Sequence, residues 1–598
     1  MAVQQTFRSA QRAPVVRVAY RPAIVLASLL VLVACGGADP GPTPPAADTT
    51  PPTIQATSPA ASASAVAPPA AITVTFSESI DAATVTTASF TVNAAGVPVA
   101  GSVSASGVMA SFVPAAPLVA GTAYTASVSA AVKDAAGNPL ATALAWSFTT
   151  AASVTSKTWS APVLLETADG PASQPVVAAT SEDLPAATTQ ATAVWVQHDG
   201  TQPSIYANRF RDGVWQGAEL VENDTAIGNI SAGGVSSPRV AMGAFGRAVI
   251  TWIHDDGNAG YSIWGAVHDE IFPGVDARQL SFGSTASDPQ LSFDGAGHEV
   301  FNVWTQYDAG RPPASYRITQ RQFLFVPCES FLPCAWDPLN VGWRSTTLIE
   351  TDPNDAIAPQ VSGFGSSGAV VVWGKAQGLF GLELWANTHS GAGGWASPVR
   401  VNPGSANRAE QHAVAAASDG SAITVWIESV AGRRTVFASR LSGTTWSTPQ
   451  SFDDASAGQA DTPQLVVDAA GNTLIVWVQL GGGAWDLYAR RCPPGPLSAC
   501  SAAQKIGNLP GSAATPRIAG APNGDAIAVW QQTDAAGQRS IYASNYTAAA
   551  GSWSASPALI DAGAGGAQVA IDKRGIGTVV WSKFDAAGKS NIYASRFR

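Results

Sequence analysis

The sequence predicts an all-β protein with two domains, a β-sandwich followed by a β-propeller. The chain has 598 residues, which is long enough for more than one domain. Residues 53–150 alternate apolar and polar side chains in short runs between turn residues, a pattern typical of sandwich strands. Residues 153–598 repeat one pattern of short strands with a period of about 50 residues, which is typical of propeller blades.

The composition indicates a folded chain. Charged residues make up 12% of it, against roughly 25% in typical soluble domains, and it contains 19 tryptophans. Disordered proteins lack such aromatic content. The net charge of −10 comes without a basic stripe, so we expect no nucleic-acid partner. We expect a monomer without cofactor or bound metal.

Residues 1–34 have the features of an export signal. Four arginines precede any acidic residue, and the apolar run that follows is too short for a membrane span. The sequence "LVACG" resembles the bacterial lipobox, and an ordinary signal peptide with an incidental cysteine is the alternative. The resemblance implies cleavage before Cys35, a diacylglycerol thioether on that cysteine and, through Gly36, sorting to the outer membrane. Residues 35–52 are rich in Pro and Gly and are predicted to be an extended tether.

The four other cysteines form two close pairs. Each pair lies within a short Pro-rich segment, "CESFLPC" and "CPPGPLSAC". In an exported protein, close and even pairs indicate disulfides, whereas zinc favours C-x-x-C spacing or adjoining histidines. We therefore predict the disulfides Cys328–Cys334 and Cys492–Cys500.

The segment 53–150 resembles the bacterial Ig-like domain of surface and S-layer proteins. The matching pieces are "PP" at its entry, "FSESIDAATV", "GTAYTASVS", "VKDAAGNPL" and the closing "WSFTT". The resemblance implies a spacer or adhesion module without catalytic residues. We interpret Asp134, at the start of "DAAGN", as part of a hairpin turn rather than of a metal loop.

The repeat that follows has a recurring frame. An apolar strand ends in Trp, a polar turn follows, and a second strand carries an aromatic residue 11 or 12 positions after the Trp. The tryptophans are Trp195, Trp252, Trp304, Trp373, Trp426, Trp477, Trp530 and Trp581. Their aromatic counterparts are Tyr206, Trp264, Tyr316, Trp385, Phe437, Tyr488, Tyr542 and Tyr593. A fourth strand often reads "WS-x-P", and the last unit stops at Arg598 without one. Because "KTWSAPVLLE" precedes the first unit, we predict eight blades closed by this N-terminal strand, which leaves no open edge.

The architecture resembles that of sialidases with BNR-like repeats, which would imply a glycan-active enzyme. Asp468, however, lies nine residues before Trp477, whereas the Asp-box acid of sialidases lies close to its aromatic residue. The repeated tyrosines offer no singular nucleophile, and the sequence has no H-E-x-x-H, G-x-S-x-G or phosphate-loop motif. No catalytic residue is predicted. The sequence favours a binding or adhesion module of the envelope, with a sialidase-type enzyme and a purely structural protein as alternatives.

Candidate ligand-binding residues follow from position in the repeat. A Pro or its positional equivalent recurs before the Trp strand in seven of the eight units. Polar residues follow this position at Arg239, Gln290, Gln360, Gln464, Arg517 and Gln568, and apolar Val176 and Ala413 follow it in the other two units. Polar residues also stand two positions after each Trp, at Gln197, His254, Gln306, Lys375, Glu428, Gln479, Gln532 and Lys583. They could line the propeller mouth or satisfy polar groups between blades. Trp485 and Phe380 lie in turns outside the frame. Exposed aromatic side chains beside amide groups are suited to binding a glycan or a peptide. The alternative for Trp485 is that its side chain packs onto its own blade.

Overall fold

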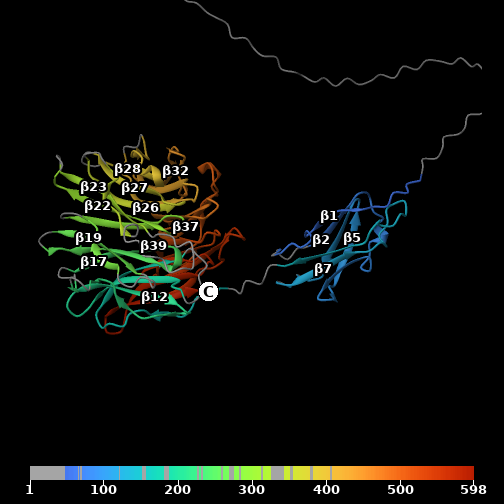
Figure 1. Cartoon of the computed structure of the whole chain (residues 1–598), viewed down its shortest axis with the longest axis horizontal. Helices are drawn as coiled ribbons and strands as arrows, with labels where there is room; N and C mark the ends of the chain where they lie inside the picture. The colour runs from blue at the N-terminus through green and yellow to red at the C-terminus, as the bar shows by residue number, and fades with distance from the viewer. Residues whose placement is uncertain are drawn as a thin grey trace, which may run out of the picture. The chain divides into compact units, whose positions relative to one another are not determined.

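The computed structural model describes most of the chain from residue 47 to residue 598. Outside the described residues lie 1–46, 65, 67–70, 117, 120, 151–156, 181–187, 225–227, 230–233, 258–259, 269–274, 282–284, 311–313, 325–341, 351–353, 378–380 and 404–406. The chain divides into two compact units between Thr155 and Ser156 (Figure 1). No helix in the described part of the chain is long and apolar enough to cross a membrane.

The first unit consists of two four-stranded antiparallel sheets. One has the order β1 (Ile54–Ser58), β2 (Ile72–Phe76), β6 (Met109–Pro114) and β5 (Gly101–Ser106). The other has the order β4 (Val97–Pro98), β3 (Phe90–Ala94), β7 (Ala123–Val128) and β8 (Leu144–Thr149). Alternate residues of both sheets, among them Phe90, Phe112 and Trp146, are buried in one common core. This confirms the predicted sandwich.

The described part of the second unit contains eight antiparallel sheets of four or five strands, which we number in chain order. Sheet 1 contains β10 (Ala172–Ala179), β11 (Ala191–His198), β12 (Pro203–Arg211), β13 (Val214–Trp215) and β14 (Glu219–Leu220). Sheet 2 contains β17 (Val235–Met242), β18 (Ala248–Asp255), β19 (Tyr261–His268) and β20 (Val275–Gln279). Sheet 3 contains β21 (Ala286–Phe293), β22 (Glu299–Asp308), β23 (Ser315–Leu324), β24 (Gly342–Trp343) and β25 (Thr347–Leu348). Sheet 4 contains β26 (Ala356–Phe364), β27 (Gly368–Gln377), β28 (Gly381–Ser390) and β29 (Val399–Arg400).

The second half repeats this plan. Sheet 5 contains β30 (Glu410–Ala416), β31 (Ala422–Val430), β32 (Arg433–Ser442), β33 (Thr445–Trp446) and β34 (Gln450–Ser451). Sheet 6 contains β35 (Ala460–Val467), β36 (Thr473–Gly481), β37 (Ala484–Cys492) and β38 (Gln504–Lys505). Sheet 7 contains β39 (Ser512–Gly520), β40 (Ala526–Thr533), β41 (Arg539–Thr547), β42 (Ser552–Trp553) and β43 (Ala558–Ala562). Sheet 8 contains β44 (Ala564–Ile571), β45 (Gly577–Phe584), β46 (Ser590–Phe597) and, from the N-terminal side, β9 (Val163–Leu164).

The repeated tryptophans form the cores between the strands. All eight lie in the second strand of their sheet, with side chains that are at most 1% exposed. In seven sheets the predicted aromatic residue lies directly opposite, as Tyr206 lies opposite Trp195. Sheet 3 differs, because Trp304 pairs with Thr319, and Tyr316 pairs with Tyr307 instead. Tyr316 lies in the second strand of its hairpin, as predicted, but not opposite Trp304, because the hairpin of β22 and β23 is longer than in the other sheets.

The first strand of each sheet contacts the first strand of the next sheet, and β44 of sheet 8 also contacts β10 of sheet 1. The N-terminal segment completes sheet 8, since Val163 and Leu164 of β9 pair with Ala594 and Tyr593 of β46. In Figure 1 the red C-terminal strands accordingly lie near the cyan-green strands around β12. Elements separated by more than 400 residues are thus held together by backbone hydrogen bonds.

The described part of the chain also contains several short elements. Strands β15 (Asn223–Asp224) and β16 (Gly228–Asn229) form a two-stranded sheet. Four 3₁₀ turns are η1 (Ala82–Thr84), η2 (Ala244–Gly246), η4 (Gly391–Gly393) and η5 (Leu497–Ala499). The predicted disulfide Cys492–Cys500 is present and ties the end of β37 to the residue after η5. Cys35, Cys328 and Cys334 lie outside the described residues.

Candidate functional site

Each first strand carries a β-bulge opposite the buried Trp of its sheet. In sheet 2, Ser236 pairs with Ile253 and Arg239 with Thr251, so two residues oppose Trp252. The same register shift recurs in the other seven sheets. Pro has no N–H for the sheet, and bulges are one of the few positions at which a strand tolerates it. The first bulge residue has a positive φ in every sheet, at Gln174, Ser237, Asp288, Ala358, Gln411, Thr462, Thr515 and Gly566.

The bulge fixes the predicted ligand-binding residues that follow each Pro. Arg239 and Arg517 are half-buried, and their Nη1 groups donate to the carbonyls of the preceding Pro238 and Pro516, both at 2.9 Å. Gln464 donates in the same way from Nε2 to Pro463, at 2.9 Å. These bonds serve the carbonyl groups that the bulge takes out of the ladder, which agrees with the structural alternative for this position.

The two arginines retain further donors. Arg517 Nε donates to Oε1 of Gln568 in the next sheet, at 3.3 Å. Burial lowers the pKa of Arg239, the charge of Arg517 lowers it further, and Asp288 opposes this. Burial also lowers the pKa of Arg517. The structure therefore brings Arg239, Arg517 and Gln568 into one electrostatic environment. Gln290 and Gln360 are half-buried at the same position of sheets 3 and 4.

Sheet 5 departs from the pattern because His412 stands at the Pro position. Its Nε2 lies 2.7 Å from the carbonyl oxygen of Ala358, the bulge residue of sheet 4. Burial lowers the pKa of His412 to about 4, so the ring is neutral at pH 7 and donates this bond as Nε2–H. Other bulges also contact the preceding sheet: Ser237 N donates to Gln174 Oε1 at 2.7 Å, and Thr462 N to Gln411 Oε1 at 2.8 Å.

The polar residues two positions after each Trp are structural. In five sheets the indole Nε1 donates to them, with donor–acceptor distances of 2.8–3.1 Å to Gln197, Gln306, Glu428, Gln479 and Gln532. All five acceptors are buried. They keep the indole N–H groups satisfied inside the core, and unsatisfied buried donors are costly.

A second set of polar residues was missed by sequence reasoning. Each member lies directly after the last apolar residue of a fourth-strand segment. The members are Glu166, Glu222, Glu350, Asn402, Asp453 and Asp561. Four of them reach the residue two positions past the Trp of the next sheet: Asn402 Nδ2 donates to Glu428 Oε1 at 3.0 Å, Lys583 Nζ to Asp561 Oδ1 at 2.7 Å, and Gln479 Nε2 to Asp453 Oδ2 at 3.4 Å. Lys375 Nζ lies 3.8 Å from Glu350 Oε1. These four residues form polar pairs between neighbouring sheets. Burial raises the pKa of Glu166, Glu222 and Asp453.

The predicted aromatic platform is only partly available. Trp485 lies in β37 opposite Leu480, is half-buried, and packs against the cluster that contains Trp530 and Leu509. Part of its ring therefore contributes to the contact between sheets 6 and 7, as the alternative interpretation holds. Phe380 lies outside the described residues.

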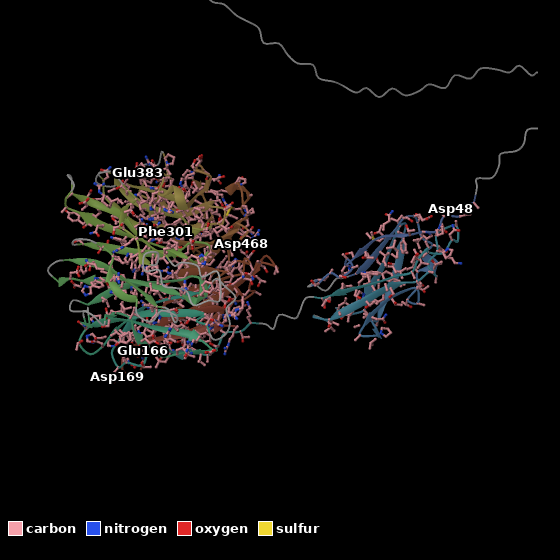
Figure 2. The ribbon with its side chains drawn as sticks, in the orientation of Figure 1. Asp48, Glu166, Asp169, Phe301, Glu383 and Asp468 are labelled. Carbon is pink, nitrogen blue, oxygen red and sulfur yellow. A yellow bond between two sulfur atoms is a disulfide. The ribbon has the colours of Figure 1, made fainter. Side chains whose placement is uncertain are left out.

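The carboxylates singled out in turns are bound by their own loops. Asp468, which Figure 2 labels, accepts at Oδ1 the N–H groups of Ala470 and Asn472, at 2.9 and 2.8 Å. Asp134 of the first unit makes the same bonds with Ala136 and Asn138, as expected for a hairpin turn. Its carboxylate, with those of Asp48 and Glu78, forms a group whose oxygen atoms lie within 4.8 Å of one another.

Comparison with known proteins places one part of the chain in a family. Residues 48–150 match the bacterial Ig-like domain family. The chain is also similar in structure to an ulvan lyase bound to -[GlcA(1-4)Rha3S]-, with 10% identity, 64% of this chain and 95% of that chain covered, and a TM-score of 0.40. The Hadza microbial sialidase Hz136 has 11% identity, covers 58% and 75%, and gives a TM-score of 0.30. The WD40 domain of SCAP from fission yeast has 7% identity, covers 74% and 98%, and gives a TM-score of 0.40. These values assign no activity to this chain.

A search of the curated proteins found no match. The match to a family model, that of the bacterial Ig-like domain, covers residues 48–150.

Proposed function

We propose that the second unit is an eight-bladed β-propeller closed by its N-terminal strand. Three observations support this. Each of the eight sheets is an antiparallel meander with the same buried Trp. Their first strands contact one another in succession from β10 to β44, and β44 contacts β10. β9 pairs with β46, so the sheet that ends the chain is completed by a strand from its N-terminal side. The first strands would then surround the central channel.

We propose further that the protein is an envelope-anchored binding module for an acidic glycan or peptide. The anchor would be a lipid on Cys35, residues 35–52 would be the tether, and the Ig-like domain a spacer. The association of such domains with surface proteins supports this arrangement. The bound molecule would lie at the propeller mouth, at the side chains that follow each bulge.

One observation carries this proposal: two half-buried arginines on the first strands share an environment that is poor in acid. In the described part of the chain no carboxylate forms an ion pair with Arg239 or Arg517, and the charge of Arg517 lowers the pKa of Arg239, an effect that Asp288 opposes. In the proposed ring β17 and β39 are three steps apart through β10 and β44. A guanidinium group binds a carboxylate through two parallel hydrogen bonds, and it does so most strongly where water is excluded. The neighbouring glutamines would bind hydroxyl or amide groups of the same ligand.

The contacts that the carboxylates already make favour binding over catalysis. Asp468 and its counterparts hold their own turns, and Glu350, Asp453 and Asp561 form pairs between sheets. A general acid or a nucleophile needs a carboxylate that faces substrate. The carboxylates of Asp468, Glu350, Asp453 and Asp561 are occupied by these contacts instead.

The test uses the mature chain from residue 35 with Cys35→Ser, on an array of polyuronates, neutral glycans and acidic peptides. We expect binding to acidic members, and loss of at least about tenfold in affinity in the Arg239→Gln/Arg517→Gln variant. Arg539→Gln is the matched control, since Arg539 is exposed in β41 and its substitution removes the same charge. Equal binding of neutral and acidic glycans, or equal loss in the control, contradicts the proposal.

A further inference from the structure

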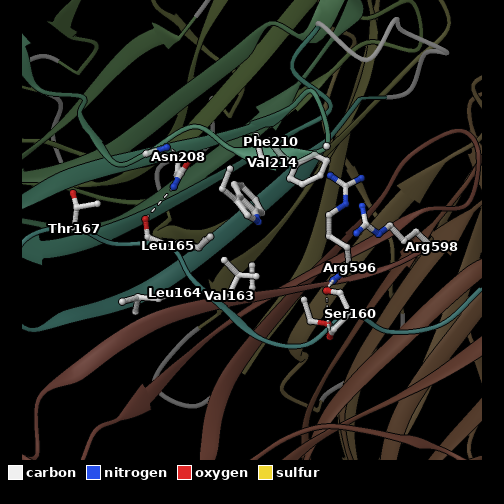
Figure 3. Close-up of a pocket in the computed structure, with 15 residues that line it drawn as sticks. Ser160, Val163, Leu164, Leu165, Thr167, Asn208, Phe210, Val214, Arg596 and Arg598 are labelled. Atoms are coloured by element: carbon white, nitrogen blue, oxygen red, sulfur yellow. Dashed lines mark hydrogen bonds between the residues drawn. The ribbon is translucent and has the colours of Figure 1, made fainter.

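A pocket of about 400 Å³ lies at the seam between sheet 8 and sheet 1, away from the bulges. Its walls come from β9, β12, β13 and β46, and include Val163, Leu164, Val214 and Trp215. Val163, Leu164 and Val214 are 46%, 49% and 57% exposed, so apolar surface is open to an occupant. Figure 3 shows Arg596 and Arg598 at one end of the pocket, and Thr167 and Asn208 at the other.

Arg596 is a buried cation without a bound acid. Its side chain is 5% exposed, and its guanidinium carbon lies 3.7 Å from the centre of the Phe210 ring. Its Nη1 atom is buried and has no hydrogen-bond partner in the described part of the chain. Burial lowers its pKa to about 10; Asp572 counteracts this, but that carboxylate already binds Arg574 at 2.8 Å. An unpaired buried charge is strongly unfavourable unless a partner neutralises it.

Arginines at the position of Arg596 in three other sheets each have a hydrogen-bond acceptor: Arg440 of sheet 5 donates to the carbonyl of Pro493 at 3.1 Å, Arg491 of sheet 6 to Oδ1 of Asn472 at 2.8 Å, and Arg209 of sheet 1 to a carboxylate. Arg209 of sheet 1 stands three residues after Tyr206, as Arg596 stands three after Tyr593. Arg209 binds Glu219 at 2.9 Å, and Glu219 also lies 3.1 Å from Nε2 of His268 in sheet 2.

The seam between sheets 8 and 1 has no carboxylate at the position of Glu219. Glu219 pairs with Ala207 in the backbone register, and the residue that pairs with the equivalent Ala594 is Val163. The position of His268 is taken by Phe210. Two polar residues are thus replaced by apolar ones, while the arginine is retained. The result is an apolar pocket with a cation at one end.

We propose that this pocket binds a small monoanion with an apolar body, of the class of alkyl carboxylates. The carboxylate would accept hydrogen bonds from the guanidinium group of Arg596, and so take the part that Glu219 plays for Arg209. The alkyl chain would lie along Val163, Leu164 and Val214. The volume lies at the lower end of the range of roughly 300–1,000 Å³ for small-molecule sites, which suits such a ligand. This site is separate from the proposed glycan or peptide site, and neither proposal depends on the other.

A ligand in this position would contact strands on both sides of the seam. It would therefore stabilise the folded chain, because binding to the native state alone raises its stability by mass action. The experiment uses the mature chain with Cys35→Ser and decanoate as the probe, below its micelle-forming concentration. Calorimetry measures affinity, and thermal unfolding measures the shift in Tm. Decanol and decylammonium serve as neutral and cationic probes of the same chain length.

We expect decanoate to bind and raise the Tm, and both other probes to bind at least about tenfold more weakly, since only the carboxylate pairs with the buried arginine. In the wild-type chain, equal binding of decanoate and decanol overturns the proposal, as does the absence of decanoate binding. This comparison requires no variant.

Val163→Glu provides an independent test, because it restores the pair that sheet 1 forms between Arg209 and Glu219. We expect a Tm equal to or above that of the wild type and a loss of decanoate binding of at least about tenfold. Ala558→Glu is the matched control: Ala558 pairs with Ala543 at the same register position of sheet 7, where Asn545 replaces the arginine. Unchanged decanoate binding in Val163→Glu overturns the proposal. A dimer of the wild-type chain that Val163→Glu dissociates also overturns it, because another copy of the chain would then occupy the pocket.

Discussion

Leu165 gives the sharpest test of how the N-terminal strand holds the second unit together. It follows β9, is 1% exposed, and lies in a cluster with Trp195 of sheet 1 and Ile592 of sheet 8. Leu165→Ala removes a side chain that contacts both ends of the proposed ring. Replacing a fully buried Leu by Ala costs about 2–5 kcal/mol, so we expect a loss of about 3 kcal/mol in the free energy of unfolding.

The adjacent Leu164 is a matched control in the same strand. It is 49% exposed, and Leu164→Ala removes the same atoms without opening a cavity. We expect this change to cost about 1 kcal/mol or less. Both variants keep the backbone hydrogen bond from Leu165 N to the carbonyl of Ile592, at 2.9 Å. The difference therefore measures side-chain packing at the seam.

Urea unfolding followed by tryptophan fluorescence is the assay. All but one of the 19 tryptophans, Trp146, lie after Thr155, so the signal reports mainly on the second unit. Hydrogen exchange adds a local measurement: we expect the amide groups of Thr158, Ser160 and Leu165, which bond to β46 and Arg598, to exchange faster in Leu165→Ala. If the two variants differ by less than about 0.5 kcal/mol, the seam does not depend on this packing and the reasoning is refuted.

Three further predictions concern single residues. Gln532→Leu leaves the buried indole N–H of Trp530 without its acceptor, and we expect urea unfolding to show a loss of about 2 kcal/mol. His412 has its pKa lowered from 6.5 to about 4 in the folded chain; because the unfolded chain then binds the proton more readily, stability should fall as pH decreases from about 6.5 to about 4, by up to roughly 3 kcal/mol. His412→Gln should lack this component, and identical pH profiles of the two chains would contradict the assignment. Cys35→Ser should release the protein from bacterial membranes in cell fractionation, whereas retention with normal maturation would remove the anchor.

Much of the fold could be predicted because the residues that mark the repeat are large aromatic side chains with one structural role in each sheet. A buried Trp every 51 to 69 residues, with an aromatic residue 11 or 12 positions later, predicts the central hairpin of each sheet. The aromatic spacing does not show that Tyr316 lies away from Trp304, because the paired residues Trp304 and Thr319 are 15 positions apart, against 11 or 12 in the other sheets. Register in a longer hairpin depends on the turn, which the aromatic spacing does not report.

The candidate site was harder to predict, because no recurring residue type marks its positions in the sequence. The recurring Pro marked a position in the repeat and was not recognised as part of a bulge; the residue with positive φ is Gln, Ser, Asp, Ala, Thr or Gly, so no residue type marks it. In most sheets the fourth-strand segment contains strands of only two residues. The polar residue that follows is a single position in each repeat. Its role became apparent only when the partner in the next sheet was known. Trp485 was expected to be exposed because it lies in a turn outside the frame, yet the same turn presses it against sheet 7.

The polar pairs between sheets explain how near-identical repeats find their correct neighbours. The pairs differ from seam to seam: Lys583 meets Asp561, Glu428 meets the amide of Asn402, and Asp453 beside Gln479 is neutralised by Arg433. The cores are all built on Trp and carry no such distinction. A wrong neighbour would place two buried acids together, which costs several kcal/mol. We infer that the cores supply stability, whereas the pairs specify the order of the sheets.

This inference predicts that a pair can be transplanted. Lys583→Glu alone should place a carboxylate beside Asp561 and cost about 2–3 kcal/mol, a value reduced because Lys583 is 33% exposed. Adding Asp561→Asn recreates the arrangement of Asn402 and Glu428, in which Glu428 also accepts the indole N–H of its own Trp426 at 2.8 Å. Most of the lost stability should then return in urea unfolding. Asp561→Asn alone should destabilise, because Lys583 loses its carboxylate and the Trp581 indole its anionic acceptor. If the double variant is no more stable than Lys583→Glu, the pairs do not act as interchangeable units, and sheet order must be specified by something else.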